Sequence, residues 1–337
     1  MYAGKSIIKR TDRPNWKDIQ PLQLRPFRPQ YNLTMAVEKV TLSEMINIDK
    51  DFLHRIQLRK SILEREITST IQVSSQCKPA IDELYTFLVA EHLPAKYPEI
   101  FKLISVSSNK SNHGQLSLMN CLNKEIFPTV PLSSPEHTMK LLATLVDEDF
   151  LFLVPSGNAY TLQGYLMCFS SGFLSAEDGA GMIGKNLSEL HKEVPGYGEF
   201  LEIKMSRWIE RMKPGSYWRR RNADRAQWTI TMNGKLRNQV GENQVYDAST
   251  HATLVKLDLS QAHLRTELQV MQRLPQSHAV LFSYKTYVYP LQEIKKEGNG
   301  PSLADAINGL RKGNVPGMYS YKGAEIWGEQ VMAYLRN

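Results

Sequence analysis

Residues 151–169, LFLVPSGNAYTLQGYLMCF, contain two apolar and aromatic runs separated by the tripeptide Ser-Gly-Asn. The first run covers residues 151–155 and the second covers residues 160–169. Strand-like runs joined by a short segment containing glycine and asparagine are typical of a β-hairpin. We therefore predict two antiparallel strands here. We also expect the architecture to change at this point, because the preceding sequence is mainly helical in pattern.

The sequence before the hairpin predicts an extended arm followed by helices. Residues 1–32 are rich in proline and arginine, and the prolines argue against a helix there. Residues 41–66 predict two helices around Asp49. In residues 79–93 the apolar side chains recur at helical spacing, and residues 137–150 predict a further helix. The first part of the chain is therefore expected to be a helical region.

The sequence after the hairpin predicts short helical turns, one longer helix and three more strands. The longer helix is expected at residues 198–212, where apolar side chains share one helical face. Strands are expected at residues 228–232, 252–259 and 279–291, and two helices follow from Ser302. This order resembles that of a PAS domain, in which a five-stranded antiparallel sheet cups a ligand against short helices.

The fold class predicted from these segments is α+β, with a PAS-like antiparallel sheet between two helical regions. Residues 1–148 would form the N-terminal arm and helical region, residues 149–300 the PAS-like core, and residues 301–337 the C-terminal helices. Many α+β folds share this order of elements, so the pattern alone does not fix the function.

The bulk composition narrows the class of protein. A hydrophobic content of 42% and a charged content of 22% are ordinary for a globular chain of 337 residues. Cys77, Cys121 and Cys168 are widely spaced, which argues against a disulfide framework, a zinc ribbon or an iron–sulfur cluster and favours a reducing compartment. No apolar run reaches the roughly 18 residues needed to cross a bilayer, and the N-terminus lacks a secretory signal. We expect a cytoplasmic protein that does not bind a membrane.

A basic segment runs from Arg207 to Arg225 and includes three consecutive arginines at 219–221, in a chain whose formal net charge is +7. No aromatic interleaving or nucleic-acid motif accompanies it, so a nucleic-acid partner is not expected. A solvated basic face is one interpretation, and docking of an electron donor is another. Because the chain has no Rossmann glycine fingerprint, no P-loop and no cysteine quartet, electrons would come from a separate reductase.

Residues 184–197, GKNLSELHKEVPGY, predict a helical turn that ends at His191 and is stopped by Pro195 and Gly196. A histidine at this position has two interpretations. It could cap the C-terminus of the helix, where an imidazolium is favourable. It could instead be a ligand to iron, because imidazole is a common metal ligand.

Four motifs follow one another in the second half of the chain: CFSSGF at 168–173, LHKEVPGY at 190–197, RAQW at 225–228, and RTELQVMQRLPQSHAVLFSYKTY at 265–287. These motifs resemble those of one known family. In the same order, the family motifs are CFPSGW, IHxPVPGY, RxNW, and RxERQTLRRLP followed by a strand that ends in RTY. The family is the haem-dependent oxidative N-demethylase α-subunit family. With similar sequence in the N-terminal helical region, the resemblance covers residues 25–300.

The chain departs from the family pattern at several positions within these motifs. Ser170 and Glu193 replace prolines, Leu268 replaces an arginine, Val270 replaces a threonine, and Gln227 replaces an asparagine. The resemblance therefore implies a divergent member, with a substrate that differs from, or is larger than, a simple dimethylamine.

The resemblance implies a monooxygenase-type oxidoreductase that binds haem b in a PAS-type pocket and uses O₂ to oxidise a methylamine carbon. His191 would be the ligand to the haem iron, and Arg225, Arg265 and Arg273 would pair with the two propionates. Glu267 would be the catalytic residue, which orients a cationic amine or assists proton delivery. The alternative for Arg265 and Glu267 is a structural ion pair on one strand.

Trp228 and Tyr287 are the remaining cofactor-binding candidates, and the alternative for both is a place in the apolar core. The resemblance further implies a small-molecule substrate, an amine or a natural product, and a separate electron-donor reductase. Apolar faces on the C-terminal helices favour self-association into a homo-oligomer. A haem-binding PAS sensor without turnover, or an interaction protein, is the alternative function.

Overall fold

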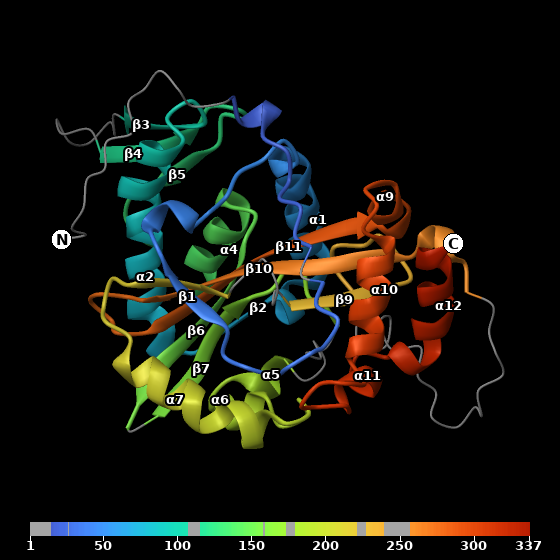
Figure 1. The fold of residues 1–337 in the computed structure, drawn as a ribbon. Helices are drawn as coiled ribbons and strands as arrows, with labels where there is room; N and C mark the ends of the chain where they lie inside the picture. The colour runs from blue at the N-terminus through green and yellow to red at the C-terminus, as the bar shows by residue number, and fades with distance from the viewer. Residues whose placement is uncertain are drawn as a thin grey trace.

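Two antiparallel sheets make up the β-structure of the described residues (Figure 1). The larger sheet has eight strands, in the order β1-β8-β10-β11-β6-β7-β2 with β9 also beside β10. Its strands are β1 (Val37–Val40), β2 (Ile71–Val73), β6 (Asp149–Ser156), β7 (Ala159–Leu166), β8 (Tyr217–Arg220), β9 (Gln227–Thr231), β10 (His263–Arg273) and β11 (Val280–Pro290). The smaller sheet contains β3 (Phe101–Val106), β4 (Gln115–Asn120) and β5 (Ile126–Pro128). The computed structural model describes residues 15–25, 27–106, 115–157, 159–172, 179–220, 227–238 and 257–337.

The described helices fall into three groups along the chain. The N-terminal group contains α1 (Phe52–Thr70), α2 (Lys78–Phe87), the π-helical turn η4 (Leu88–His92), α3 (Leu93–Lys96) and α4 (Pro135–Leu145). The middle group contains α5 (Gly179–Met182), α6 (Leu187–Leu190), the π-helical turn η5 (Tyr197–Leu201) and α7 (Glu202–Arg211). The C-terminal group contains α9 (Leu291–Lys296), α10 (Gly300–Gly309), α11 (Met318–Tyr321) and α12 (Ala324–Arg336). Short 3-10 turns are η1 (Trp16–Asp18), η2 (Leu42–Glu44), η3 (Ser75–Cys77) and η6 (Leu259–Gln261).

The hairpin predicted at residues 151–169 is confirmed. Strands β6 and β7 pair antiparallel along their length. Gly157 in the connecting turn has a φ of +57°, in the left-handed region that glycine adopts without steric cost. The local sequence therefore specifies this pairing, because both the strand pattern and the turn residue agree with it.

Two of the three strands predicted after the hairpin are confirmed, and most of the third lies outside the described residues. Residues 228–232 and 279–291 correspond to β9 and β11. Of the third segment, 252–259, residues 252–256 lie outside the described part of the chain, and the rest is not a strand. The carboxylate of Asp258 accepts a hydrogen bond from the backbone N–H of Ser260, which begins the 3-10 turn η6 there instead.

The helix predictions hold in outline but not at every boundary. Only one full helix forms within residues 41–66, because Ile46 has a φ of +54° and interrupts the helical path before α1. The helix expected at 137–150 ends at Leu145, and the acidic residues that follow lead into β6. The predicted C-terminal helices are confirmed as α10 and α12, with α9 and α11 in addition.

The predicted mixed fold of antiparallel sheets and helices is confirmed, and the larger sheet is wider than five strands. Segments from the first part of the chain add β1 beside β8 and β2 beside β7. These short strands pair with backbone groups that would otherwise lie at open sheet edges.

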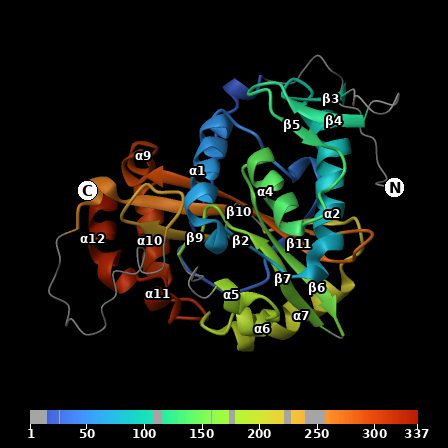
Figure 2. The same cartoon turned by 180° about the vertical axis from the view of Figure 1, so that it is seen from behind.

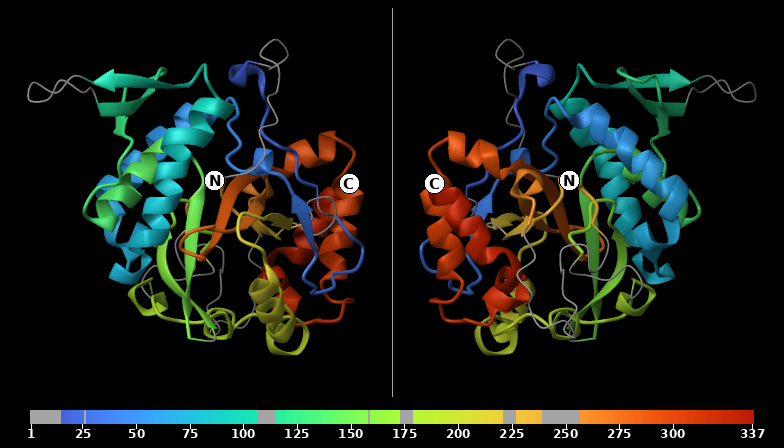
Figure 3. Two further views of the ribbon diagram at one scale, coloured as in Figure 1. Left: turned by 90° about the vertical axis from the view of Figure 1, so that its left-hand side faces the viewer. Right: turned by 90° about the vertical axis from the view of Figure 1, so that its right-hand side faces the viewer.

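The N-terminal and C-terminal helices lie towards opposite ends of the long strands β10 and β11 (Figures 2 and 3). One apolar cluster joins the N-terminal helices to Phe150 and Phe152. A second cluster joins the C-terminal helices to Leu264 and Leu268. By strand register, the four side chains Phe150, Phe152, Leu264 and Leu268 all project from the same side of the sheet. Because the long strands twist, this side faces the N-terminal helices at one end and the C-terminal helices at the other.

The opposite side of the sheet packs against α5, α6 and α7. Strand register places Leu151, Trp218, Met271 and Phe282 on this side. Glu267 projects from the same side of β10, nearer the start of the strand than Met271. We call this surface the α7 face. These side chains are only half-buried although they belong to strands inside the sheet, whereas Leu268 and Val270 on the other side of β10 are fully buried. Among the described residues, the side chains of the α7 face are therefore less completely covered than those on the other side of the sheet.

Candidate functional site

The short helix α6 positions His191 at its C-terminal end. The side-chain oxygen of Asn186 accepts a hydrogen bond from the backbone N–H of Glu189 at 3.0 Å, and the carboxylate of Glu189 accepts one from the N–H of Asn186 at 2.8 Å. This capping box satisfies backbone donors that so short a helix cannot pair internally. The sequence Asn-Leu-Ser-Glu therefore fixes where α6 begins and where His191 follows it.

The turn after His191 depends on a glycine. Gly196 has a φ of +73°, and a Cβ at this position would lie 2.6 Å from a methyl carbon of Val315. A residue with a side chain would therefore be strained and would also collide with the segment before α11. The turn brings Tyr197 back over His191, so that the two rings are stacked with centroids 4.6 Å apart. This geometry explains the Val-Pro-Gly-Tyr sequence.

The imidazole of His191 has one engaged nitrogen and one unengaged nitrogen. Its Nδ1 lies 2.8 Å from the carbonyl oxygen of Leu187, to which a neutral imidazole donates. Burial lowers the pKa of His191 below its ordinary value of 6.5, and the nearby charge of Arg220 lowers it further. Within the described residues Nε2 has no hydrogen-bond partner. Metal-bound histidines usually have this arrangement, with the non-ligating N–H donated to a carbonyl or carboxylate.

The same contact also agrees with the capping interpretation, because the imidazole satisfies a carbonyl of α6 through Nδ1. The two interpretations use different nitrogens of one ring. Capping therefore does not prevent a second role for Nε2.

Glu267 lies on the α7 face of β10 and is half-buried. Its Oε2 accepts a hydrogen bond of 2.9 Å from the side-chain amide of Gln269, two residues further on the same side of the strand. Within the described residues no ion pair joins Glu267 to Arg265, so the interpretation of these two as a structural pair is not what the structure shows. The other carboxylate oxygen, Oε1, has no hydrogen-bond partner among the described residues.

The guanidinium of Arg265 is buried and mainly bound by carbonyl groups. Nη1 donates to Leu236 at 2.7 Å, and Nη2 donates to Phe169 at 2.5 Å. Nη2 also lies 3.3 Å from the hydroxyl of Thr286. Only Nε lacks an acceptor. Arg265 thus connects β10 to the CFSSGF segment, which follows β7.

Arg273 lies at the far end of β10 and contacts the end of α7. Its Nη1 donates to the carbonyl of Met212 at 3.0 Å and lies 3.3 Å from that of Glu210, so it caps the helix C-terminus. Its buried Nε has no acceptor. The third arginine named from the sequence, Arg225, lies outside the described residues.

Trp228 and Tyr287 are both opposite Thr266 in their strand pairs, so they project from the side of the sheet away from Glu267. Both are buried in the apolar cluster of the C-terminal helices. The ring of Tyr287 is parallel to that of Tyr289, at a centroid distance of 6.3 Å. Their positions agree with the core interpretation, and the structure separates them from the α7 face.

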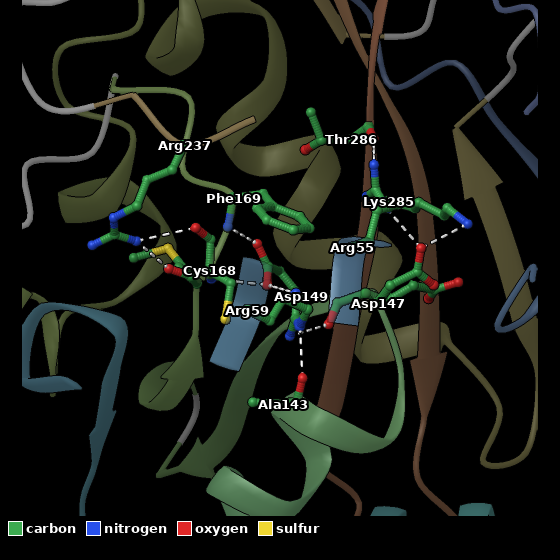
Figure 4. Close-up of polar contacts among 12 residues, drawn as sticks. Arg55, Arg59, Ala143, Asp147, Asp149, Cys168, Phe169, Arg237, Lys285 and Thr286 are labelled. Atoms are coloured by element: carbon green, nitrogen blue, oxygen red, sulfur yellow. Dashed lines mark hydrogen bonds and ion pairs between the residues drawn. The ribbon is translucent and has the colours of Figure 1, made fainter. Parts of the chain in front are cut away.

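A buried network of charges that the sequence prediction missed fixes the first strand of the core (Figure 4). Asp149, at the start of β6, forms an ion pair of 2.6 Å with Arg59 on α1. Its carboxylate also accepts the backbone N–H groups of Cys168, at 2.9 Å, and Phe169, at 2.7 Å. The network therefore fixes the segment after β7 that carries one of the family motifs.

A second part of the network lies beside the first. Asp147 accepts from Arg55 at 2.7 Å and from Lys285 at 2.9 Å, and Lys285 also pairs with Asp49 at 2.9 Å. Arg55 further donates to the carbonyl of Thr286. The sequence feature that could have indicated this network is the acidic run Asp147-Glu148-Asp149 directly before an apolar strand. Carboxylates buried at the start of a strand need cationic partners.

Two hydroxyl groups on the same side of the sheet as Glu267 and Arg265 are buried without partners. They belong to Tyr165, opposite Leu151, and Thr229, opposite Arg265. Buried polar atoms without partners are rare in folded proteins and require an explanation such as a bound group. Together with the partly exposed apolar side chains of the α7 face, they fit a large, mostly apolar ligand that carries a few polar atoms.

These features define an α+β protein in which Nε2 of His191 has no hydrogen-bond partner among the described residues and the α7 face is half-buried. A family model described as haem-dependent oxidative N-demethylase, alpha subunit-like matches residues 36–332. The chain belongs to this family. The match confirms the resemblance inferred from the four motifs.

No cluster of three or more histidine, cysteine, aspartate or glutamate side chains in the described ranges could hold a metal ion. No helix in the same part of the chain is both long and apolar enough to span a membrane.

Proposed function

We propose that this chain binds haem b, with His191 as a ligand to its iron, and uses O₂ to oxidise an amine or a related C–H centre. The observation that carries the proposal is the imidazole of His191, whose Nδ1 is bound to a carbonyl while Nε2 has no partner among the described residues. The family description, which names haem and oxidative N-demethylation, supports the same activity.

A PAS-like core would provide the pocket. The strands β6, β7, β10 and β11, with β8 and β9 beside β10, form one antiparallel unit that α5, α6 and α7 cover on one side. The half-buried Met271, Phe282 and Trp218 offer apolar surface of the kind that a macrocycle requires. The unpaired hydroxyls of Tyr165 and Thr229 supply polar atoms on the same side. These residues fit the proposed cofactor.

We assign the remaining roles as follows. The carboxylate of Glu267 would orient a protonated amine through its free oxygen, or hold a proton near the reacting centre. Arg225, Arg265 and Arg273 stay candidates for the cofactor's carboxylates. Among the described residues, the guanidinium nitrogen without an acceptor is Nε in Arg265, whereas in Arg273 both Nε and Nη2 are without one. Trp228 and Tyr287 would support the pocket from the far side of the sheet.

The chemistry that haem supplies when bound is the redox activation of O₂. The protein's own residues would bind the cofactor, exclude water and orient the substrate, an amine or natural product other than, or larger than, dimethylamine. The alpha-subunit description supports further subunits, and electrons would come from a separate reductase. The three cysteines are free, as in a reducing, cytoplasmic compartment.

The test is an absorption spectrum of the purified full chain before and after addition of ferric protoporphyrin IX. We expect a Soret band that His191→Ala abolishes or shifts. The matched control is His263→Ala, because His263 is also half-buried and its Nδ1 also lies close to a backbone carbonyl, that of Gln261 at 2.7 Å. The control should keep the wild-type spectrum.

Protein that stays colourless after reconstitution would contradict the proposal. Turnover is tested with O₂, a chemical reductant and a panel of methylated amines, with formaldehyde as the measured product. Gas binding without any product would instead support the haem-binding sensor.

A further inference from the structure

Lys322, directly after α11, is a buried lysine with an incomplete set of partners. Lys322 is only 2% exposed. Its Nζ donates to the carbonyl oxygen of Trp228 and lies 5.3 Å from the centroid of that residue's ring. A lysine ammonium has three N–H donors. Within the described residues the other two have no acceptor, and no carboxylate lies within ion-pair distance of Nζ.

A buried ammonium without a counter-ion is energetically costly. Burial lowers the pKa of Lys322 to about 7; the charge of Arg220 on β8 lowers it as well, and that of Glu267 on β10 raises it. The contrast with Lys285 is clear, because that equally buried lysine has both Asp49 and Asp147 at 2.9 Å. Lys322 therefore lies where an anion from outside the chain would complete the site.

The segment that carries Lys322 packs against the turn after His191. Val315 lies over Gly196, and a Cβ on Gly317 would be 3.6 Å from Pro195. The charge of Arg220 lowers the pKa of His191 as well as that of Lys322. The His191 turn, the end of β8 and the end of α11 therefore meet in one region.

We propose that Lys322 binds a carboxylate of the ligand that His191 holds. The inference rests on the proposed function, in which that ligand is haem and the carboxylate is a propionate. The ammonium would donate its free N–H groups to the carboxylate oxygens, as lysine does at anion sites. A carboxylate at this position would also restore the charge of Lys322, so that binding takes up a proton above neutral pH.

The competing explanation is structural. Lys322 satisfies the carbonyl of Trp228 on β9, a strand that in the described part of the chain pairs with β10 alone. If that were its whole role, replacing Lys322 would destabilise the cofactor-free protein and leave ligand binding unchanged. If Lys322 serves an anion, replacing it with an apolar residue would leave the cofactor-free protein as stable or more stable and would weaken binding.

The experiment compares ferric protoporphyrin IX with its dimethyl ester, which lacks the carboxylates, on the full chain at pH 8. Affinity is measured by absorbance titration, and proton uptake by calorimetry in two buffers of different ionisation enthalpy. We expect the wild type to bind the diacid at least about tenfold more tightly than the ester, because a charge-assisted hydrogen bond is worth roughly that factor or more. We expect proton uptake only with the diacid.

The variant Lys322→Met should reduce both the preference and the proton uptake, and urea unfolding of the cofactor-free protein should show no loss of stability. Equal wild-type affinities for the two porphyrins would overturn the inference without needing any variant. An unchanged preference in a folded Lys322→Met protein would overturn it as well. If neither porphyrin bound, the proposed function would fail and this inference with it. If both bound through His191 with equal affinity, only this inference would fail.

Discussion

The imidazole of His191 lies parallel to the ring of Tyr197, with an interplanar angle of 7° and centroids 4.6 Å apart. The same imidazole is held at Nδ1 by the carbonyl of Leu187. A ring that is fixed both by an in-plane hydrogen bond and by stacking has little freedom to rotate. The direction of Nε2 is therefore set before any ligand binds, which reduces the entropic cost of binding.

The stacking predicts that Tyr197 determines how well His191 serves as an axial ligand. Tyr197→Leu should weaken haem binding by about 10- to 100-fold, the range seen when groups that orient a metal ligand are removed. It should also shift the Soret band. Tyr197→Phe keeps the ring and is the matched control, because the hydroxyl has only a long contact of 3.7 Å to the sulfur of Met205. Equal affinities for the two variants would show that stacking has no part in ligation.

Glu267 is predicted to act on the substrate and not on the fold. Glu267→Gln should lower product formation by about 100-fold or more, which is the usual contribution of a positioned acid or base. The Soret spectrum and the free energy of unfolding should stay near wild type, since a glutamine can still accept the hydrogen bond from Gln269. Glu293→Gln, at an exposed position on α9, is the control and should leave all three measurements unchanged. A fully active Glu267→Gln protein would remove Glu267 from the catalytic role.

The ion pair of Asp149 and Arg59 is predicted to be essential for stability. Asp149→Asn leaves the buried guanidinium of Arg59 without its counter-ion, which typically costs about 3–5 kcal/mol. The loss is measured by urea unfolding monitored by fluorescence and circular dichroism. Asp305→Asn breaks the exposed pair with Arg336 and should cost about 0–1 kcal/mol. Similar values for the two variants would mean that the buried network contributes little.

The buried histidine of η4 predicts a loss of stability in mild acid. Burial, with a smaller effect of Lys96, lowers the pKa of His92 from its ordinary 6.5 to about 4. Between these values the unfolded chain binds a proton that the folded chain does not, so stability falls as pH drops from about 6.5 towards 4. From pH 7 to 4.5 this group should remove about 2 kcal/mol. His92→Gln can still donate to the carbonyl of Met45 but does not titrate in this range. Between pH 7 and 4.5 the variant should therefore lose about 2 kcal/mol less stability than the wild type. An unchanged pH dependence in unfolding titrations would contradict the assignment.

Much of the local structure could be predicted from short stretches of sequence. The β6–β7 hairpin, the helix that begins at Phe52 and the end of α6 at His191 each depend on residues within one segment. Strand periodicity, helical periodicity and turn residues act over a few positions, so they can be read without knowing the fold. The family motifs are local in the same sense, and the family assignment was accordingly correct.

The partners of the charged side chains could not be predicted in this way. Arg265 was expected to face a cofactor carboxylate or Glu267, but its terminal nitrogens contact the carbonyls of Phe169 and Leu236. Trp228 and Tyr287 were predicted to bind the cofactor or to lie in the core, and strand register places them on the side of the sheet away from Glu267. Sequence spacing shows that neighbours on a strand alternate; it does not show which side a helix will cover.

The sequence by itself determined the class of elements, the family and the position of His191, because these depend on contacts within a few residues along the chain. The tertiary structure alone decided that Lys322 reaches Trp228, 94 residues away, and that Arg59 reaches Asp149, 90 residues away. Such pairs form only when strand register and sheet twist bring distant segments together. The physical reason is that a buried charge must find a partner in space, and proximity in space is a property of the whole fold.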